Sequence, residues 1–207
     1  MTWRARLIML FPALLTSLVL AAGFYVVAKP GSISAVMAVF MLYGFAPLAY
    51  RLHQRLWPLH QGLSRLDQPV YSPWWGAHQI QLFYDAFPAL EALLRLIPGA
   101  YSAWLRAWGS RIGRRVHWTP RVDITDRGLL EVGDDVIFGH LVGCYAHVVD
   151  RRGGRLMLYS KPIRIGAGAF IGAGSRLGPG ARIEPGSYLP ALTDVGIREI
   201  RRVGQSG

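Results

Sequence analysis

The sequence contains little cysteine and little acidic charge. Its 207 residues include a single cysteine, Cys144, so no disulfide can form within the chain. Charged residues make up 17% of the chain, below the roughly 25% usual in soluble domains, and hydrophobic residues make up 52%. Twelve Asp and Glu face 23 Lys and Arg, which gives a net charge of +11. Such a basic chain suits anionic lipid, nucleic acid or a phosphorylated ligand.

Several ligand-binding motifs are absent as well. The sequence has no P-loop, no dinucleotide-binding fingerprint and no Cys/His zinc spacing, so we expect no metal. A basic cluster precedes and follows position 110, and consists of Arg106, Arg111, Arg114 and Arg115. We interpret this cluster as a contact for anionic lipid headgroups and expect no nucleic-acid partner.

Two uncharged apolar runs occupy the start of the chain. Residues 7–28 are long enough to cross a bilayer core of about 30 Å, and residues 33–50 are near the lower limit for crossing. Residues 29–32, with the sequence Lys-Pro-Gly-Ser, form a turn between them. A cleaved signal peptide is the alternative for the first run, but that run is longer than a signal core and a second follows directly. The sequence predicts a transmembrane helical hairpin over 1–52.

Basic residues flank this hairpin asymmetrically. Arg4 and Arg6 precede the first run, three arginines follow the second at positions 51, 55 and 65, and the turn carries only Lys29. The positive-inside rule then places both ends at the cytoplasmic face. We expect a multi-pass protein of the inner (cytoplasmic) membrane whose remaining chain is cytoplasmic.

Residues 53–110 show helical patterns and contain five of the seven tryptophans. Apolar residues between Ile80 and Leu94 recur at spacings of three and four, which is typical of an amphipathic helix. Pro88 should kink or restart that helix, and a further short helix should stop near Gly109. Helices of this kind suit the membrane interface, or they are core helices that pack on the following domain.

An aliphatic residue recurs every six positions near the C-terminal end. The series is Ile165, Ile171, Leu177, Ile183, Leu189 and Val195. A small or β-branched residue follows four positions after each of the first five. An earlier array has the pairs Val132/Val136, Phe138/Val142 and Cys144/Val148, and Ile112/Val116 looks like an isolated first hexad.

Three such hexads make one triangular coil, with a short strand and a turn on each side. The aliphatic residue points into the prism, and each coil buries its interior only by stacking on its neighbours. Cys144 takes such an inward position, so it is expected in the core and not as a nucleophile. A flexible Gly-rich linker would not hold an aliphatic residue in register six times.

The repeated stretch "RIGAGAFIGAGSRLGPG" and the segment "YAHVVDRRGG" carry a family resemblance. From about Arg111 to Val195 the chain resembles the hexapeptide-repeat, left-handed parallel β-helix family, most of whose members are acyltransferases that use acetyl-CoA or another acyl donor. More narrowly, it is similar to bacterial polysaccharide O-acetyltransferases of the colanic-acid type and to hexapeptide domains of some non-ribosomal peptide synthetases. This resemblance implies a mainly β fold, an acyl-CoA co-substrate and a homotrimer.

The six-residue period is lost between Tyr145 and Ile165, where Asp150–Gly154 form a projecting turn. The family carries a histidine base on the coil surface, and the motif maps that role to His147, ahead of His140. A histidine is suited to remove the proton of a hydroxyl or amine near neutral pH. Either histidine could instead be a solvated surface residue. Asp123, Asp134, Asp135 and Asp150 are candidates to orient the imidazole, and no spacing selects one.

Acyl-CoA lies along the C-terminal coils in the family. The backbone N–H groups of Gly166 and Gly172 could hold an oxyanion or thioester carbonyl. Arg164, Arg176 and Arg182 could bind the CoA phosphates, although arginines on a coil surface also serve solubility.

The leading hypothesis is a membrane-anchored O- or N-acyltransferase that acts on a glycan, glycolipid or other lipid-linked acceptor. The alternatives are a non-catalytic trimeric scaffold and a metalloenzyme like the γ-type carbonic anhydrases, whose motif pairs two histidines five apart, whereas His140 and His147 are seven apart. The expected domains are a hairpin over 1–52, interface helices over 53–110, a left-handed β-helix over 111–200 and a disordered tail over 201–207.

Overall fold

The computed structural model describes residues 2–202, which divide into two compact units. The first unit comprises the chain up to Leu59 together with Pro69–Phe87, and the second comprises His60–Gln68 and the chain from Pro88 onward. This division differs from the expected boundaries at 52/53 and 110/111. The segment 53–110 is shared between the two units and is not one structural block.

The first unit is helical. Its elements are α1 (Trp3–Ile8), α2 (Phe11–Ala28), α3 (Ser32–Val39), the π-helical turn η1 (Phe40–Gly44), α4 (Phe45–Leu56) and α5 (Pro73–Ala86). The helical runs 3–28 and 32–56 are long and apolar enough to cross a membrane, judged by length and composition. Their expected helical character and the break at Lys29–Gly31 are confirmed.

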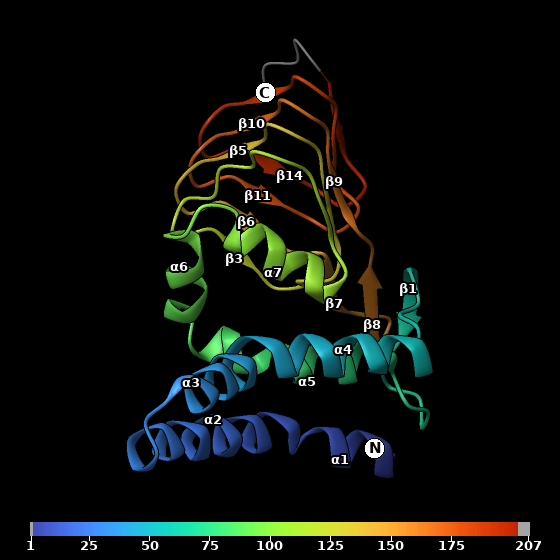
Figure 1. The fold of residues 1–207 in the computed structure, drawn as a ribbon. Coiled ribbons are helices and arrows are strands. Elements are labelled where there is room, and N and C mark those ends of the chain that lie inside the picture. Colours follow the sequence, from blue (N-terminus) through green and yellow to red (C-terminus); the bar gives the residue numbers. More distant parts are fainter. Residues whose placement is uncertain (1, 203–207) are drawn as a thin grey trace. The chain divides into compact units, whose positions relative to one another are not determined.

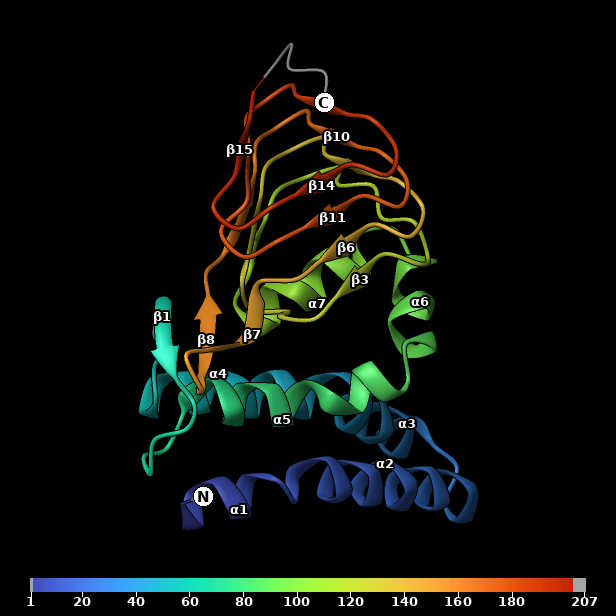
Figure 2. The same cartoon turned by 180° about the vertical axis from the view of Figure 1, so that it is seen from behind.

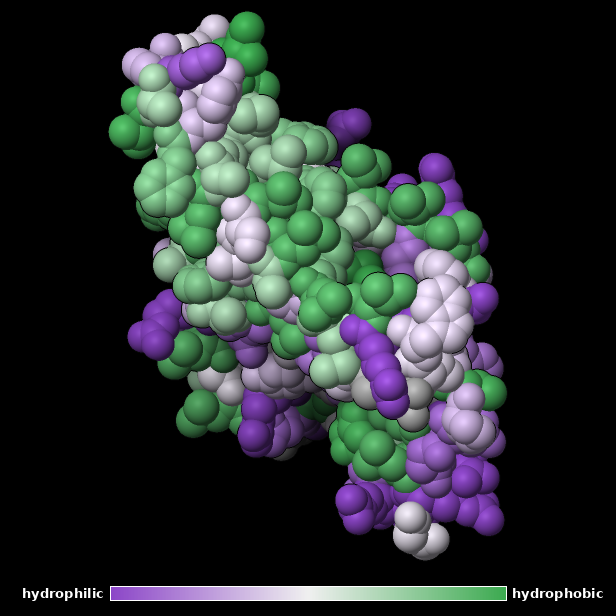
Figure 3. Space-filling model, turned by 90° about the horizontal axis from the view of Figure 1, so that it is seen from below, coloured by the Kyte–Doolittle hydropathy of each residue, from purple (hydrophilic) through white to green (hydrophobic). Residues whose placement is uncertain are grey.

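Most side chains of these two runs face outward. Exposed apolar residues include Leu20, Phe24, Ile33 and Val36, and a space-filling view shows a broad hydrophobic area with hydrophilic groups near its ends (Figure 3). The π-helical turn ends three residues before Pro47 in the second run. This proline lacks the N–H that would continue a regular ladder.

The helices of the second unit follow Pro88. Helix α5 ends at Ala86 and α6 (Ala89–Arg95) follows, so the expected restart at this proline is confirmed. Helix α7 (Ala100–Trp108) ends at Gly109, whose φ of 115° only glycine adopts readily. Leu105 and Trp108 of α7 are fully buried.

Short parallel strands form three sheets in the rest of this unit. The largest has the order β15-β12-β9-β4-β2, with β2 (Arg111–Ile112), β4 (Leu130–Val132), β9 (Ile163–Ile165), β12 (Arg182–Ile183) and β15 (Ile200–Arg201). The second has the order β14-β11-β6-β3, with β3 (Asp123–Ile124), β6 (Gly143–Cys144), β11 (Arg176–Leu177) and β14 (Asp194–Val195). The third has the order β13-β10-β5, with β5 (Ile137–Phe138), β10 (Phe170–Ile171) and β13 (Tyr188–Leu189).

Successive strands along the chain visit the three sheets in turn. In one sheet Ile112 pairs with Val132, Val132 with Ile165, and Ile165 with Ile183, so each round of the chain adds one layer. The stacked layers are visible in Figures 1 and 2. The fold is mainly β with parallel sheets, as the hexads predict, and its left-handedness stays a prediction.

The six aliphatic residues of the C-terminal array line the interior. None of them is more than 3% exposed. Ile112 is not isolated, because Trp118 and Ile124 follow at the same spacing of six and are also buried. The Trp118 ring stacks on Phe138 with centroids 4.4 Å apart. The pattern missed this first coil because an aromatic residue takes an inward position.

A β-hairpin interrupts the coils where the period is lost. Strands β7 (His147–Arg152) and β8 (Arg155–Ser160) pair antiparallel, and β1 (Gly62–Arg65) adds to β8 (Figure 2). The expected turn over Asp150–Gly154 is confirmed only at Gly153 and Gly154, both of which have positive φ and so suit a two-residue hairpin loop. Asp150–Arg152 belong to strand β7 instead. Val148, expected as the residue four positions after Cys144 in a hexad, instead pairs with Tyr159 in the hairpin, and Ala146 is buried.

The C-terminal end of the described chain is still part of a sheet. Arg201 pairs with Ile183, so the expected disordered tail does not begin at 201. Residues 203–207 of that predicted tail lie outside the described residues.

Candidate functional site

His147 is held by a buried carboxylate. It is the first residue of β7, and its Nδ1 lies 2.7 Å from Oδ2 of Asp126. The His147 side chain is 17% exposed and that of Asp126 is 6% exposed. The hydroxyl of Thr125 donates a second hydrogen bond to the same Asp126 oxygen at 3.0 Å. A carboxylate at Nδ1 fixes the orientation of the imidazole and favours the proton on that nitrogen.

Asp126 begins the turn that joins β3 to β4. The backbone N–H of Leu129 donates to the carbonyl of Asp126 at 3.0 Å, which closes a four-residue turn, and aspartate is favoured at the first position of such turns. Ile124 pairs with Cys144 one coil later, and Asp126 and Ala146 each follow two positions after these residues. Asp126 therefore lies at the corner of the prism that His147 occupies in the next coil.

Sequence reasoning did not find Asp126. The four predicted orienting residues have other partners: Asp123 bonds to Tyr145, Asp134 accepts from the N–H of Arg114, Asp135 pairs with Arg115, and Asp150 accepts from the N–H of Arg151. The signal that could have identified Asp126 is the 20-residue offset between Ile124 and Cys144. That offset was invisible because the first coil was not recognised.

His140 has a different setting. It is exposed in the turn between β5 and β6, and its backbone carbonyl accepts a hydrogen bond from the N–H of Gly174 at 2.7 Å. Of the two histidines predicted as the base, His147 is thus the one whose imidazole is oriented by a carboxylate.

The backbone N–H groups of the two glycines predicted to hold an oxyanion already donate to backbone carbonyls. The N–H of Gly166 donates to Ile183 at 2.8 Å, and that of Gly172 donates to Leu189 at 2.9 Å. These bonds join adjacent coils, so neither N–H is available for a thioester carbonyl, contrary to the expectation. A Cβ at either position would collide with backbone of the next coil, which explains the glycines on packing grounds.

A basic groove follows the outer face of the five-stranded sheet. Strand register aligns Arg111, Glu131, Arg164 and Arg182, and the groove has a volume of about 430 Å³. Nε of Arg164 lies 2.9 Å from Oε2 of Glu131. Within residues 2–202, the side chains of Arg111 and Arg182 have no hydrogen-bond or ion-pair partner, which leaves two guanidinium groups for an anion.

The five predicted CoA-contacting residues are not brought together as one set. Arg164, Gly166 and Arg182 line this groove. Arg176 lies in a different sheet and pairs with Asp194 through two hydrogen bonds, at 2.8 and 2.6 Å. That pairing lowers the pKa of Asp194 below its usual range.

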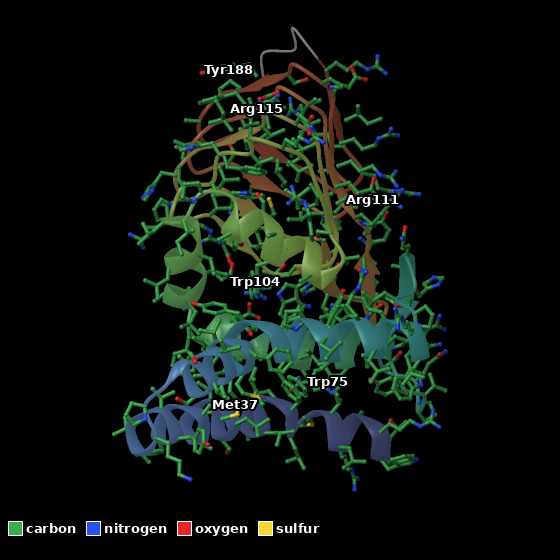
Figure 4. All side chains as sticks on the ribbon, viewed as in Figure 1. Met37, Trp75, Trp104, Arg111, Arg115 and Tyr188 are labelled. Atoms are coloured by element: carbon green, nitrogen blue, oxygen red, sulfur yellow. The ribbon has the colours of Figure 1, made fainter. Side chains whose placement is uncertain are left out.

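The outer face of the third sheet is apolar. Phe170 pairs with Ile137 on one side and Tyr188 on the other, and the rings of Phe170 and Tyr188 stack with centroids 5.3 Å apart. Tyr188 is 65% exposed. Figure 4 shows Tyr188 and Arg111 at the outer surface, on two of the three sheets.

Metal chemistry has no cluster of ligands to support it in the described part of the chain. Across residues 2–202, no group of three or more His, Cys, Asp and Glu side chains is arranged to hold a metal ion. The single cysteine, Cys144, is fully buried, as its inward position predicts.

No family model matches the sequence, and no curated protein matches it. Among solved structures, a hexapeptide-repeat acetyltransferase from Vibrio cholerae, in complex with acetyl coenzyme A, is 19% identical. The match covers 54% of this chain and 82% of that protein, with a TM-score of 0.40.

Two further similar structures are transferases. An N-acyltransferase from Bacillus cereus, in complex with dTDP-4-amino-4,6-dideoxyglucose and coenzyme A, is 14% identical over 48% of this chain and 80% of its own, with a TM-score of 0.30. A maltose O-acetyltransferase from Clostridium difficile is 16% identical over 57% of this chain and 86% of its own, with a TM-score of 0.24. At these identities and TM-scores, the matches do not assign an activity to this chain.

Proposed function

We propose that this chain is a membrane-anchored acyltransferase that moves an acyl group, with acetyl-CoA as the first donor to test, to a hydroxyl or amine. The observation that carries the proposal is the His147–Asp126 pair, because it places an oriented imidazole at the interruption of a hexapeptide coil. The acceptor is a glycan, glycolipid or other lipid-linked molecule, since two helices long and apolar enough to span a membrane precede the coils. The arginines that flank these helices favour the cytoplasmic face for the reaction.

In this reaction His147 acts as general base. Asp126 holds Nδ1, so Nε2 takes the proton of the acceptor hydroxyl or amine while the acceptor atom attacks the thioester carbonyl. The tetrahedral intermediate then collapses, the C–S bond breaks, and the proton passes from His147 to the departing CoA sulfur. The Asp126 carboxylate stabilises the imidazolium formed in between. No covalent enzyme intermediate is needed.

The basic groove supplies the charge for the donor. Arg111 and Arg182, with Arg164 beside them, match the negative phosphates of CoA, since guanidinium groups bind phosphate in a bidentate manner. We also propose that the chain forms a homotrimer, for which the apolar face of Ile137, Phe170 and Tyr188 is the candidate contact surface. Light scattering of the detergent-solubilised protein distinguishes one chain from three.

The test is acyl transfer by the full chain in membranes. Membranes are incubated with acetyl-CoA and with longer acyl-CoAs, released CoA thiol is measured, and the molecule that gains the mass of the acyl group is identified. His147→Ala should lower the rate by roughly 100- to 10,000-fold, the usual contribution of a general base. Asp126→Asn should also lower it, by a smaller factor.

The matched control is His140→Ala, which removes the exposed histidine of the neighbouring turn. This variant should transfer acyl groups at the wild-type rate. An unchanged rate in His147→Ala would remove His147 as the base. No transfer by the wild-type protein from any donor would favour the non-catalytic scaffold.

A further inference from the structure

The residue after Asp126 belongs to a buried ion network. Arg127 is 2% exposed and its Nε donates to Oε1 of Glu91 on α6 at 2.7 Å, with its Nη2 bonded to the same oxygen. The other oxygen of Glu91, Oε2, accepts from Nη2 of Arg95 at 2.9 Å and from the hydroxyl of Tyr101 at 2.6 Å. Glu91 is 4% exposed, so one carboxylate is enclosed by two guanidinium groups.

Tyr101 completes the network as a hydrogen-bond donor. Burial, reinforced by the charge of Glu91, raises the pKa of Tyr101 well above its usual value, so its hydroxyl stays protonated and donates to the carboxylate. The Arg95 guanidinium also lies 4.1 Å from the centre of the Tyr101 ring. Arg95 further donates to the carbonyl of Pro120 at 2.8 Å, which ties α6 to the first coil.

The backbone of Arg127 is fixed separately. Its carbonyl accepts a hydrogen bond from the Ser110 hydroxyl at 2.7 Å, and the same hydroxyl accepts from the N–H of Leu130 at 2.9 Å. Side chain and carbonyl of Arg127 are therefore both held by residues outside the turn. Arg127 follows Asp126 directly in the chain. Because the two residues share a peptide bond, these contacts restrict the direction in which the Asp126 carboxylate points.

A network of this kind is poorly explained by stability alone. Removing charges from water costs free energy, and replacing a buried ion pair by apolar residues of similar volume is often neutral or stabilising. If only stability were required, leucine or methionine side chains in place of the network would be sufficient. The ion network differs from such a core in fixing direction, because each guanidinium bonds to a particular carboxylate oxygen.

We propose that Glu91 and Arg127 are positioning residues that hold Asp126 in line with Nδ1 of His147. This proposal deepens the proposed function and rests on it for its kinetic consequences. The geometry at His147 is a property of the folded protein, so it can be tested whether or not acyl transfer is observed.

The test uses the full chain with ¹⁵N-labelled histidine in detergent micelles. Long-range ¹H–¹⁵N spectra report which ring nitrogen of each neutral histidine carries the proton, and the loss of one signal in His147→Gln assigns His147 among the six histidines. In the wild type His147 should be protonated at Nδ1, facing Asp126.

The triple variant Glu91→Leu/Arg95→Met/Arg127→Met replaces the network by an apolar core and should remain folded, as judged by its thermal unfolding midpoint. His147 should lose its preference for the Nδ1–H tautomer. The kcat for acyl transfer should fall by about 100-fold, the order of loss that a misplaced catalytic group causes, with KM for the donor unchanged.

Arg95→Met is the matched control, because it removes an arginine from the same network but leaves Glu91 bonded to Arg127. It should keep the Nδ1–H tautomer and the wild-type kcat. An Nδ1–H tautomer in the triple variant would overturn the proposal, and so would its loss in the Arg95→Met control. If the triple variant does not fold, Arg127→Lys takes its place, because lysine keeps the charge but lacks the planar fork. Retention of the Nδ1–H tautomer of His147 in Arg127→Lys would then overturn the proposal. Absence of acyl transfer in the wild type, with the tautomer changing as expected, would overturn the proposed function and leave the positioning role standing.

Discussion

Cys144 shows how far a single position can be interpreted. It lies inside the coil on β6, and burial, with a smaller effect of nearby Asp123, raises the pKa of its thiol from 9.0 to about 12. The thiolate is the nucleophilic form of cysteine, so this side chain is inert at neutral pH. Its hexad position gave the same expectation from sequence.

We therefore predict that Cys144 does not react with N-ethylmaleimide at pH 8 until the protein is unfolded, and that Cys144→Ala keeps the acyl-transfer rate. Because the folded pKa lies above the unfolded one, the thiol's contribution to stability is complete below pH 9 and is lost as the pH rises toward 12. Mass spectrometry of native and denatured samples measures the labelling. Rapid labelling of the native protein would show that Cys144 is accessible.

Asp126 and Arg127 show the limit of reasoning from single positions. Both lie in "DITDRGLL", outside the hexads recognised from the sequence and outside any motif. Their partners, His147 and Glu91, are 21 and 36 residues away in sequence. Only the stacking of coils and the packing of α6 bring each pair together, so no local spacing could identify them.

The elements of the solenoid depend on close approach between coils. Gly172 faces the backbone of Pro190 and Ala191, where a Cβ has no room, whereas Gly186 has open space around it and a φ of +70°. The two glycines are thus required for different reasons, one by packing and the other by backbone conformation.

We predict that Gly172→Ala lowers the free energy of unfolding by about 1–3 kcal/mol through overpacking. Gly186→Ala should cost about 1 kcal/mol, the strain of an L residue with positive φ. Thermal unfolding followed by circular dichroism in detergent compares the two variants. A larger loss for Gly186→Ala would mean that the coils can separate to accommodate a methyl group at position 172.

The hairpin of β7 and β8 was predicted only as a turn. Gly153 and Gly154 indicate that the chain reverses direction there, because two residues with positive φ form a two-residue hairpin loop. The third strand, β1, has no alternation of apolar and polar residues that would mark it. Its pairing of Gly62 with Ser160, which itself pairs with His147, is a long-range backbone contact.

The whole molecule combines two helical runs able to span a membrane with a coil that carries the candidate site. The connecting strand β1 belongs to the second unit, although residues on both sides of it, up to Leu59 and from Pro69, belong to the first. The chain therefore leaves the helical unit, joins the hairpin and returns before the coils begin.

We predict that the turn between the helical runs faces away from the cytoplasm. In a Cys144→Ala background, Gly31→Cys should be labelled by a membrane-impermeant maleimide added to intact spheroplasts, because Gly31 is exposed in that turn. Arg151→Cys, in the exposed part of β7, should be labelled only after the membrane is permeabilised. The reverse pattern would invert the proposed orientation and place the candidate site outside the cytoplasm.

The sequence by itself determined the apolar helical runs, the parallel coils, the inward residues of the C-terminal array and the interruption at His147. Each of these follows from a local period or from composition, which a single chain displays directly. The tertiary structure alone decided which carboxylate orients His147, that Gly166 and Gly172 serve coil packing, and that Arg176 lies on a different face from Arg164 and Arg182. These outcomes depend on which residues adjacent coils place side by side, and turns and insertions of unequal length between hexads hide that register from the sequence.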